Sequence, residues 1–273
     1  MGVGDILDET IRLYRESFLL FVATAGVLLA PLLLLGAVAW IGALTLGAST
    51  MDTTGVGAPS GPLVLLWIIL GLAGFVVSLL GVAALTVVAS QRYLNQPITV
   101  RDAYAAALKR LGPLLLASLW AGVRLLPIIA ISAFTIGVPF LIYYTLAWIL
   151  IPQAVVLEGV GAGGASKRSR TLVNGYWWKT LGLYLVLSIL LNILAAIPTL
   201  VLTAVIGGIA TAATGSSTAL VVVYAIVSVV TPALLLPLVF IATTLLFYDL
   251  KIRKEAFDLQ TMAETTMPSF PWS

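Results

Sequence analysis

The sequence predicts an all-α protein that crosses a membrane six times, and three observations support this fold class. The chain has 273 residues, of which 61% are hydrophobic and 9% are charged, whereas a soluble domain carries about 25% charged residues. Several apolar runs without a charge reach about 20 residues, which is enough to cross the hydrocarbon core of a bilayer. These runs are continuous rather than alternating, which excludes a transmembrane β-barrel.

The six predicted spans are separated by polar segments or by loops rich in small residues. They cover residues 19–47, 63–90, 112–135, 138–157, 181–207 and 219–248. Spans three and four are joined by a tight turn at Gly137-Val-Pro139, and we expect the spans to form three hairpins. Residues 1–260 are assigned to a single membrane domain, and residues 261–273 to a flexible cytoplasmic tail.

The positions of the basic residues orient the chain. Every lysine and arginine except Arg124 precedes span one, follows span six, or lies between spans two and three or four and five. With six spans these segments share one face, which the positive-inside rule makes cytoplasmic. We therefore expect a multi-pass protein of the cell membrane with both termini in the cytoplasm.

Short amphipathic helices are predicted at the cytoplasmic face, over residues 5–18, 99–111 and 165–178. Thr99 and Asp102 have the spacing of a capping box, which would start the second of these helices. Each helix precedes one of the predicted hairpins. We expect these helices to lie at the membrane surface, because each has an apolar face beside charged residues.

The charged segment after span six, residues 247–260, is predicted to continue as a helix. Its opposite charges stand four residues apart, as Asp249/Arg253, Lys251/Glu255 and Lys254/Asp258, a spacing that stabilises helices. Tyr248, Ile252, Ala256 and Leu259 form its apolar stripe. We expect this helix and the three surface helices to pack into a cytoplasmic collar, with Ile252 and Leu259 turned inward.

The residue types exclude most catalytic chemistry. The chain has no cysteine and no histidine, which removes the thiolate and imidazole groups that commonly act as bases or metal ligands. The predicted spans contain no aspartate or glutamate of the kind that proton-coupled transport uses. Gly159, Gly161 and Gly164 match a dinucleotide fingerprint but follow a helix instead of a strand. We expect no enzyme activity, catalytic residue, metal or cofactor, and no nucleic-acid partner.

Arg124 is the one charged residue inside a predicted span. It lies about 21 Å beyond Arg110 along an ideal helix, which places it in the outer half of the bilayer. Because the spans lack acids, its partner would be Gln153, Asn192, a hydroxyl, a carbonyl or a lipid phosphate. Intramembrane charges usually face a partner or a cavity. Arg124 is therefore either a structural anchor or a binding residue for an anionic ligand.

A second group of candidate binding residues comprises Lys167, Arg168 and Arg170. A helix that starts near Gly164 would present free backbone N–H groups beside these cations. This combination suits a lipid phosphate at the membrane surface. The alternative is an ordinary basic loop with a flexible glycine hinge, as the positive-inside rule alone would produce.

Four polar segments carry a family resemblance: residues 4–15, 152–159, 169–179 and 248–259. Together they resemble the prokaryotic six-span proteins named after the membrane domain of glycerophosphoryl diester phosphodiesterase. The resemblance implies a six-span fold, which in many members stands alone without a known activity. Other members carry a fused phosphodiesterase that uses histidines and acids around a metal. Since this chain lacks histidine, the resemblance does not imply that activity here.

These observations favour a non-enzymatic membrane module that scaffolds a partner or binds lipid through its basic cytoplasmic face. The expected partners are membrane lipids and a membrane or cytoplasmic protein. The alternative is an uncoupled transporter or flippase-like protein for a lipid or hydrophobic solute, with Arg124 on its path. A water-accessible cavity that reaches Arg124 between spans three, four and five would favour the transporter, and a sealed core would favour the module.

Overall fold

The computed structural model describes residues 1–47, 61–132, 137–215 and 218–266. Within these residues the chain is helical and contains no strand, which confirms the all-α prediction. Six helical stretches are long and apolar enough to cross a membrane, at Phe18–Gly36, Gly61–Tyr93, Val100–Ile131, Val138–Leu157, Trp177–Ala213 and Leu234–Ala256. Each overlaps a predicted span, and the polytopic all-α fold is confirmed.

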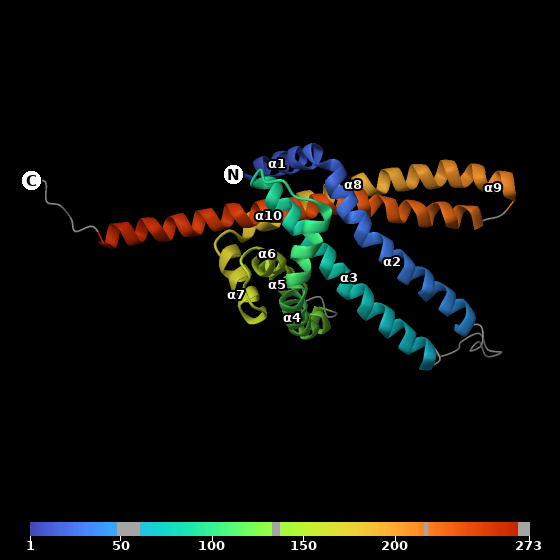
Figure 1. The fold of residues 1–273 in the computed structure, drawn as a ribbon, viewed down its shortest axis with the longest axis horizontal. Helices are drawn as coiled ribbons and strands as arrows, with labels where there is room; N and C mark the ends of the chain where they lie inside the picture. The colour runs from blue at the N-terminus through green and yellow to red at the C-terminus, as the bar shows by residue number, and fades with distance from the viewer. Residues whose placement is uncertain (48–60, 133–136, 216–217, 267–273) are drawn as a thin grey trace, which may run out of the picture.

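The longest helix, α10 (Thr218–Thr266), is the element on which much of the molecule packs (Figure 1). It has 49 residues, and an α-helix of that length extends over about 70 Å. It contacts the N-terminal helix α1 (Val3–Glu16), and the spans α2 (Phe18–Gly47), α3 (Gly61–Tyr93) and α8 (Trp177–Leu202). It therefore joins the first, second and fifth candidate spans to its own.

The end of α10 differs from the predicted flexible tail. The helix continues through Thr266, so residues 261–266 are helical in the structure. The remaining residues of the predicted tail, 267–273, lie outside the described part of the chain.

Three hairpins diverge from a common junction and point in different directions (Figure 1). The first is α2 with α3. The second joins α4 (Val100–Ser132) to α5 (Val138–Ala147). In the third, α8 continues through a π-helical turn, η1 (Thr203–Gly207), and α9 (Gly208–Thr214) before α10 returns alongside it. This arrangement agrees with the predicted pairing of the spans.

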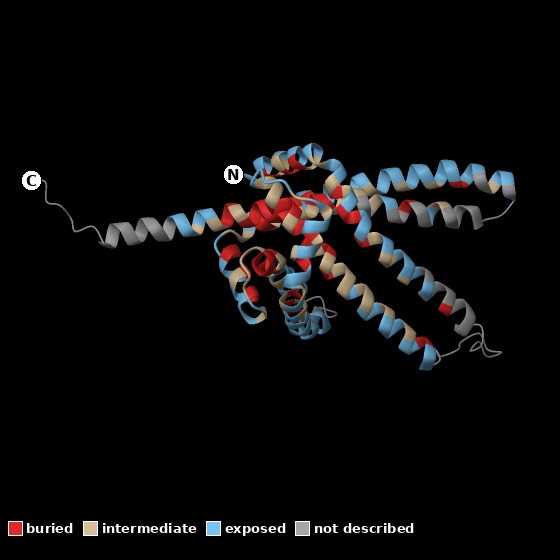
Figure 2. Ribbon diagram, in the orientation of Figure 1, coloured by how far each residue is buried: buried red, intermediate tan, exposed pale blue. Residues whose placement is uncertain are grey.

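The buried core lies where the hairpins meet (Figure 2). Ile6, Phe21, Leu85, Leu114 and Phe247 are all buried there, and they come from five different helices. Away from the junction the spans expose large apolar side chains over most of their length. Such extensive apolar exposure is incompatible with water, so the hydrocarbon core of a membrane is the environment that these helices require.

The second predicted surface helix is not separate from the span that follows it. Residues 99–111 and the start of span three belong to one continuous helix, α4, which passes through Pro113. The expected cap is present, since the Asp102 N–H donates to Thr99 Oγ1 at 3.2 Å. A proline normally clashes with the Cβ of the residue before it. Here that residue is Gly112, which has no Cβ, so this clash is absent; α4 also continues through Pro127, which follows Leu126.

Predicted span four is divided into two helices, α5 and α6 (Ile151–Leu157), by a turn at residues 148–150. Pro152 lacks the N–H that would continue the hydrogen-bond ladder back to Trp148. The Trp148 carbonyl instead accepts a bond from the Ile151 N–H at 3.1 Å. The turn directs the two halves of the span along different paths and leaves Trp148 at the bend.

The expected collar forms, but α10 turns a different face toward it. Ile6 of α1, Ala103 of α4, Leu172 of α7 (Ala162–Val173) and Leu250 of α10 belong to the same buried cluster. Ile252 was predicted to point inward and is 61% exposed. The prediction for Ile252 is therefore wrong, because Leu246, Phe247 and Leu250 continue the buried face of the span into this segment. The Leu259 side chain lies outside the described residues.

A cationic cavity between three helices as the candidate functional site

Helix α7 forms one wall of the candidate site, and its neighbours fix its position. It begins after the extended Gly161 and ends before the turn at Gly175, where φ is +86°. Ser169, fully buried in the middle of α7, donates to the Ala147 carbonyl at 2.7 Å and accepts from the Leu150 N–H at 3.2 Å. These are backbone groups that the break between α5 and α6 leaves open. One serine therefore ties α7 to the turn that carries Trp148.

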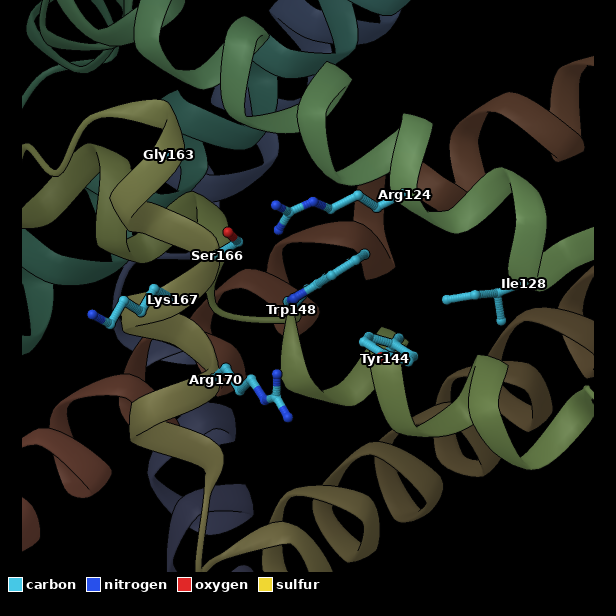
Figure 3. Close-up of a pocket in the computed structure, with 8 residues that line it drawn as sticks. All are labelled: Arg124, Ile128, Tyr144, Trp148, Gly163, Ser166, Lys167 and Arg170. Atoms are coloured by element: carbon cyan, nitrogen blue, oxygen red, sulfur yellow. The ribbon is translucent and has the colours of Figure 1, made fainter.

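The cavity between α4, α5 and α7 has a volume of about 550 Å³. The residues that line it are Arg124, Ile128, Tyr144, Trp148, Gly163, Ser166, Lys167 and Arg170. Three of the four predicted site residues, Arg124, Lys167 and Arg170, are thus brought together. In Figure 3 the Arg124 side chain extends from α4 toward α7, the Trp148 ring lies between the two arginines, and Lys167 turns outward at the rim.

Arg124 has a different neighbour from those expected. Its guanidinium lies over the ring of Trp120, 4.4 Å from the centroid, which is a cation–π contact. Gln153 instead donates to Thr243 Oγ1 at 2.9 Å, and Asn192 donates to the Ser188 carbonyl at 2.8 Å. Neither amide contacts Arg124, and the Gln153 Oε1 atom is buried without a partner, so the guanidinium edge remains available in the cavity.

The structure brings Arg124, for which the sequence predicts a place in the outer half of the bilayer, to the same cavity as basic residues of α7. Helices α4 and α7 pack against each other, so Arg124 lies at the same cavity as Lys167 and Arg170. Distance along α4 from Arg110 therefore does not separate Arg124 from the basic segment. The spacing along one helix could not reveal this, because it depends on how a second helix packs.

Arg168 is separated from the other predicted site residues by its ion pairs. Its guanidinium contacts Glu158 at 2.7 Å and Glu255 of α10 at 2.8 Å, and Lys251 contacts Glu158 at 2.9 Å. The predicted pair of Lys251 with Glu255 is therefore replaced by contacts to other helices. The Asp249–Arg253 pair forms as predicted, at 3.0 Å. Arg168 is thus part of the scaffold that holds α7 on α10.

The cavity carries an uncompensated positive charge. No carboxylate lines it, and Arg124, Lys167 and Arg170 form no ion pair with any described acid. The other polar side chains at its wall are the hydroxyls of Tyr144 and Ser166 and the indole N–H of Trp148, all of which can donate hydrogen bonds. A cavity lined by cations and donors is suited to an anion that is rich in acceptor oxygens.

The sequence did not predict the other residues near the candidate cations, which are Trp120, Tyr144, Trp148 and Ser166. A signal existed for Trp120, which precedes Arg124 by four residues and therefore lies on the same helical face. No comparable signal marks Trp148 or Ser166, because both reach the cavity through contacts between helices distant in sequence. Among the described residues, no group of three acids, histidines or cysteines could hold a metal ion.

Comparisons with protein families, with curated proteins and with solved structures found no match to this chain. The resemblance to the six-span proteins therefore stays a prediction. The geometry and charge of the cavity are therefore the observations that bear on the function of this protein.

Proposed function

We propose that this protein is a non-enzymatic membrane module that binds an anionic lipid, and that the cavity at Arg124, Lys167 and Arg170 receives the headgroup. The observation that carries the proposal is that Arg124, Lys167 and Arg170, none of which pairs with a described acid, all line one cavity of about 550 Å³. Cations held close together repel one another unless an anion neutralises them. The positive-inside rule places this basic surface on the cytoplasmic side of the cell membrane, with both termini there.

The apolar neighbours of the cavity favour a lipid. In Figure 3, Ile128 of α4 and Tyr144 of α5 lie on the side of the cavity away from α7. Phe140, one further turn along α5, is 59% exposed. A ligand with a charged head at α7 and acyl chains along α4 and α5 would satisfy both surfaces.

The test replaces Arg124 and measures the lipid that the purified full chain retains. Arg124→Leu should leave the protein folded and reduce the retention of anionic lipid by about tenfold or more, since a charge-assisted contact to phosphate is lost. Native mass spectrometry of the detergent-solubilised protein measures the retained lipid. The matched control is Arg101→Leu, which changes an exposed arginine of α4 that lies outside the cavity. Equal retention by wild type and Arg124→Leu would contradict the proposal.

The cavity also supports a second candidate function, an uncoupled transporter or flippase-like protein for a lipid. Its support is that the cavity reaches Arg124, as the transporter hypothesis requires. Against it, α8 contributes no residue to the lining, although the fifth span was expected to take part. Reconstitution into liposomes with a labelled anionic lipid in one leaflet distinguishes the two. Accelerated exchange between leaflets that depends on Arg124 favours the transporter, whereas Arg124-dependent binding without exchange favours the module.

A further inference from the structure

We propose that the cavity selects a phosphomonoester group, as in the headgroup of phosphatidic acid, over the phosphodiester headgroups of other anionic lipids. This inference rests on the proposed lipid-binding function and specifies its ligand. A phosphomonoester presents three terminal oxygens and close to two negative charges near neutral pH. A phosphodiester presents two free oxygens and one charge, so the number of donors and charges at the cavity can discriminate between them.

Two arginines from different helices present their guanidinium groups at the cavity. Arg124 comes from α4 and Arg170 from α7, and in Figure 3 their guanidinium groups lie on opposite sides of the Trp148 ring. A guanidinium binds phosphate through two parallel N–H donors. Because the Trp148 ring lies between the two groups, a phosphate that contacts both needs free oxygens on more than one side, and a monoester has three free oxygens whereas a diester has two. The exposed Lys167 at the rim adds a third charge.

Ser166 supplies an independent observation. Its side chain lines the cavity although the residue is only 6% exposed, and its hydroxyl forms no hydrogen bond with a described residue. A hydroxyl at a cavity wall without a protein partner can donate to a ligand there. Gly163, which also lines the cavity, lies in the first turn of α7, where helix geometry leaves N–H groups free and favours an anion. This part of the wall therefore has the features of a binding site for acceptor oxygens.

The same features disfavour other classes of ligand. A cationic or zwitterionic headgroup would need an acid for its ammonium group, and no carboxylate lines the cavity. A neutral lipid would leave the charges of Arg124, Lys167 and Arg170 uncompensated. The ligand class that matches both the charge and the donors is a compact polyanion with acceptor oxygens on several sides.

The experiment titrates the purified full chain in detergent with phosphatidic acid and, separately, with phosphatidylglycerol of the same acyl chains. Native mass spectrometry counts the bound lipid. Wild type should bind phosphatidic acid about tenfold more tightly, the effect of one additional charge-assisted contact. Arg170→Gln and Ser166→Ala should each reduce this preference. Arg101→Gln, outside the cavity, should keep it.

Each remaining outcome has a defined meaning. Equal affinity for both lipids with continued dependence on Arg124 would overturn the phosphomonoester inference and leave the lipid-binding proposal intact. Binding of both lipids that ignores Arg124 and Arg170 would overturn both. A further arm adds inorganic phosphate in excess over the lipid. Full displacement of phosphatidic acid would assign the site to a soluble phosphate and overturn the lipid as its source, whereas retention supports the lipid.

Discussion

The carboxylate of Glu158 accepts two hydrogen bonds from the guanidinium of Arg168, each at 2.7 Å. The pair joins the end of α6 to α7, and Glu255 extends it to α10. The side chains of Glu158 and Arg168 are 13% and 28% exposed, respectively, so water screens their interaction less than that of a surface pair. Because α7 carries Lys167 and Arg170, this ion pair fixes the wall of the candidate site.

A double-mutant cycle should therefore find strong coupling between Glu158 and Arg168. We expect Glu158→Gln, Arg168→Gln and the double variant to give an interaction energy of about 1–3 kcal/mol, as for hydrogen bonds between charged groups. Thermal unfolding in detergent at neutral pH is the measurement. Lys167→Gln is the control on the same helix, since Lys167 forms no ion pair with a described acid. A coupling energy near zero would contradict this role.

The same pair predicts a pH dependence of stability. The hydrogen bond from Arg168 lowers the pKa of Glu158 below its ordinary value of 4.5. A folded-state pKa below the unfolded value means that the ionised carboxylate stabilises the folded protein above pH 4.5. This contribution is lost as the pH falls through the lower folded-state pKa.

The measurement compares the melting temperatures of wild type and Glu158→Gln from neutral to acidic pH. The advantage of wild type should be constant near neutral pH and should shrink as the solution becomes more acidic than the ordinary pKa of the carboxyl. Glutamine cannot titrate, so the variant supplies the reference. An advantage that stays the same at every pH would show that Glu158 stabilises the fold without its charge.

The burial pattern of α10 predicts that alanine substitutions at two residues two positions apart lower the stability by very different amounts. Leu250 is fully buried and Ile252 is 61% exposed. Leu250→Ala should cost about 2–5 kcal/mol of unfolding free energy, because it leaves a cavity in the core. Ile252→Ala should change the unfolding free energy by no more than about 0.5 kcal/mol. Denaturant unfolding of both variants provides the test. A larger loss for Ile252→Ala than for Leu250→Ala would support the predicted inward orientation of Ile252.

Gly81 permits the close approach of α3 to α2. A Cβ at this position would lie 2.7 Å from Leu28 Cγ, with both Leu28 methyl groups nearer still. Gly81→Ala should therefore destabilise the hairpin by about 1–3 kcal/mol through overpacking. Adding Leu28→Ala should recover part of that loss, because the obstructing side chain is removed. Gly71→Ala in the same helix meets nothing within 4 Å, so it serves as the control in the thermal unfolding series.

Ser169 and Ser166 form a matched pair on α7. Ser169 is fully buried and makes two hydrogen bonds to the turn between α5 and α6, whereas the Ser166 hydroxyl bonds to no residue in the described part of the chain. Ser169→Ala should cost about 1–3 kcal/mol, because buried backbone groups lose their partner. Ser166→Ala should cost less, and its effect should instead appear in ligand binding. A thermal unfolding series decides this, and equal losses for both variants would contradict the assignment.

Local patterns in the sequence were sufficient to predict the helices and one of their caps. The capping contact of Thr99 with Asp102 forms within a few residues, so its prediction needed no tertiary contact. Helix ends were less predictable. Helix α4 continues through Pro113 and Pro127, although each proline removes an N–H from the hydrogen-bond ladder, so the prolines alone do not mark where this helix ends.

The candidate cations were also recognisable from sequence, but their grouping was not. Arg124, Lys167 and Arg170 line one cavity, while Arg168 pairs with acids from α10 and from the end of α6. Adjacent residues on a helix point in different directions. Sequence proximity of Lys167, Arg168 and Arg170 therefore could not indicate which of them faces a cavity and which faces an acid.

Composition and the length of apolar runs determined by themselves that this is an all-α chain with six candidate membrane spans. The physical reason is that a backbone in hydrocarbon must satisfy its own hydrogen bonds, which a continuous apolar run does as a helix. The tertiary structure alone decided which face of α10 is buried, how α7 meets α4, and that Arg124 lies with Arg170. These features depend on packing between distant segments, which the spacing of residues along one helix does not encode.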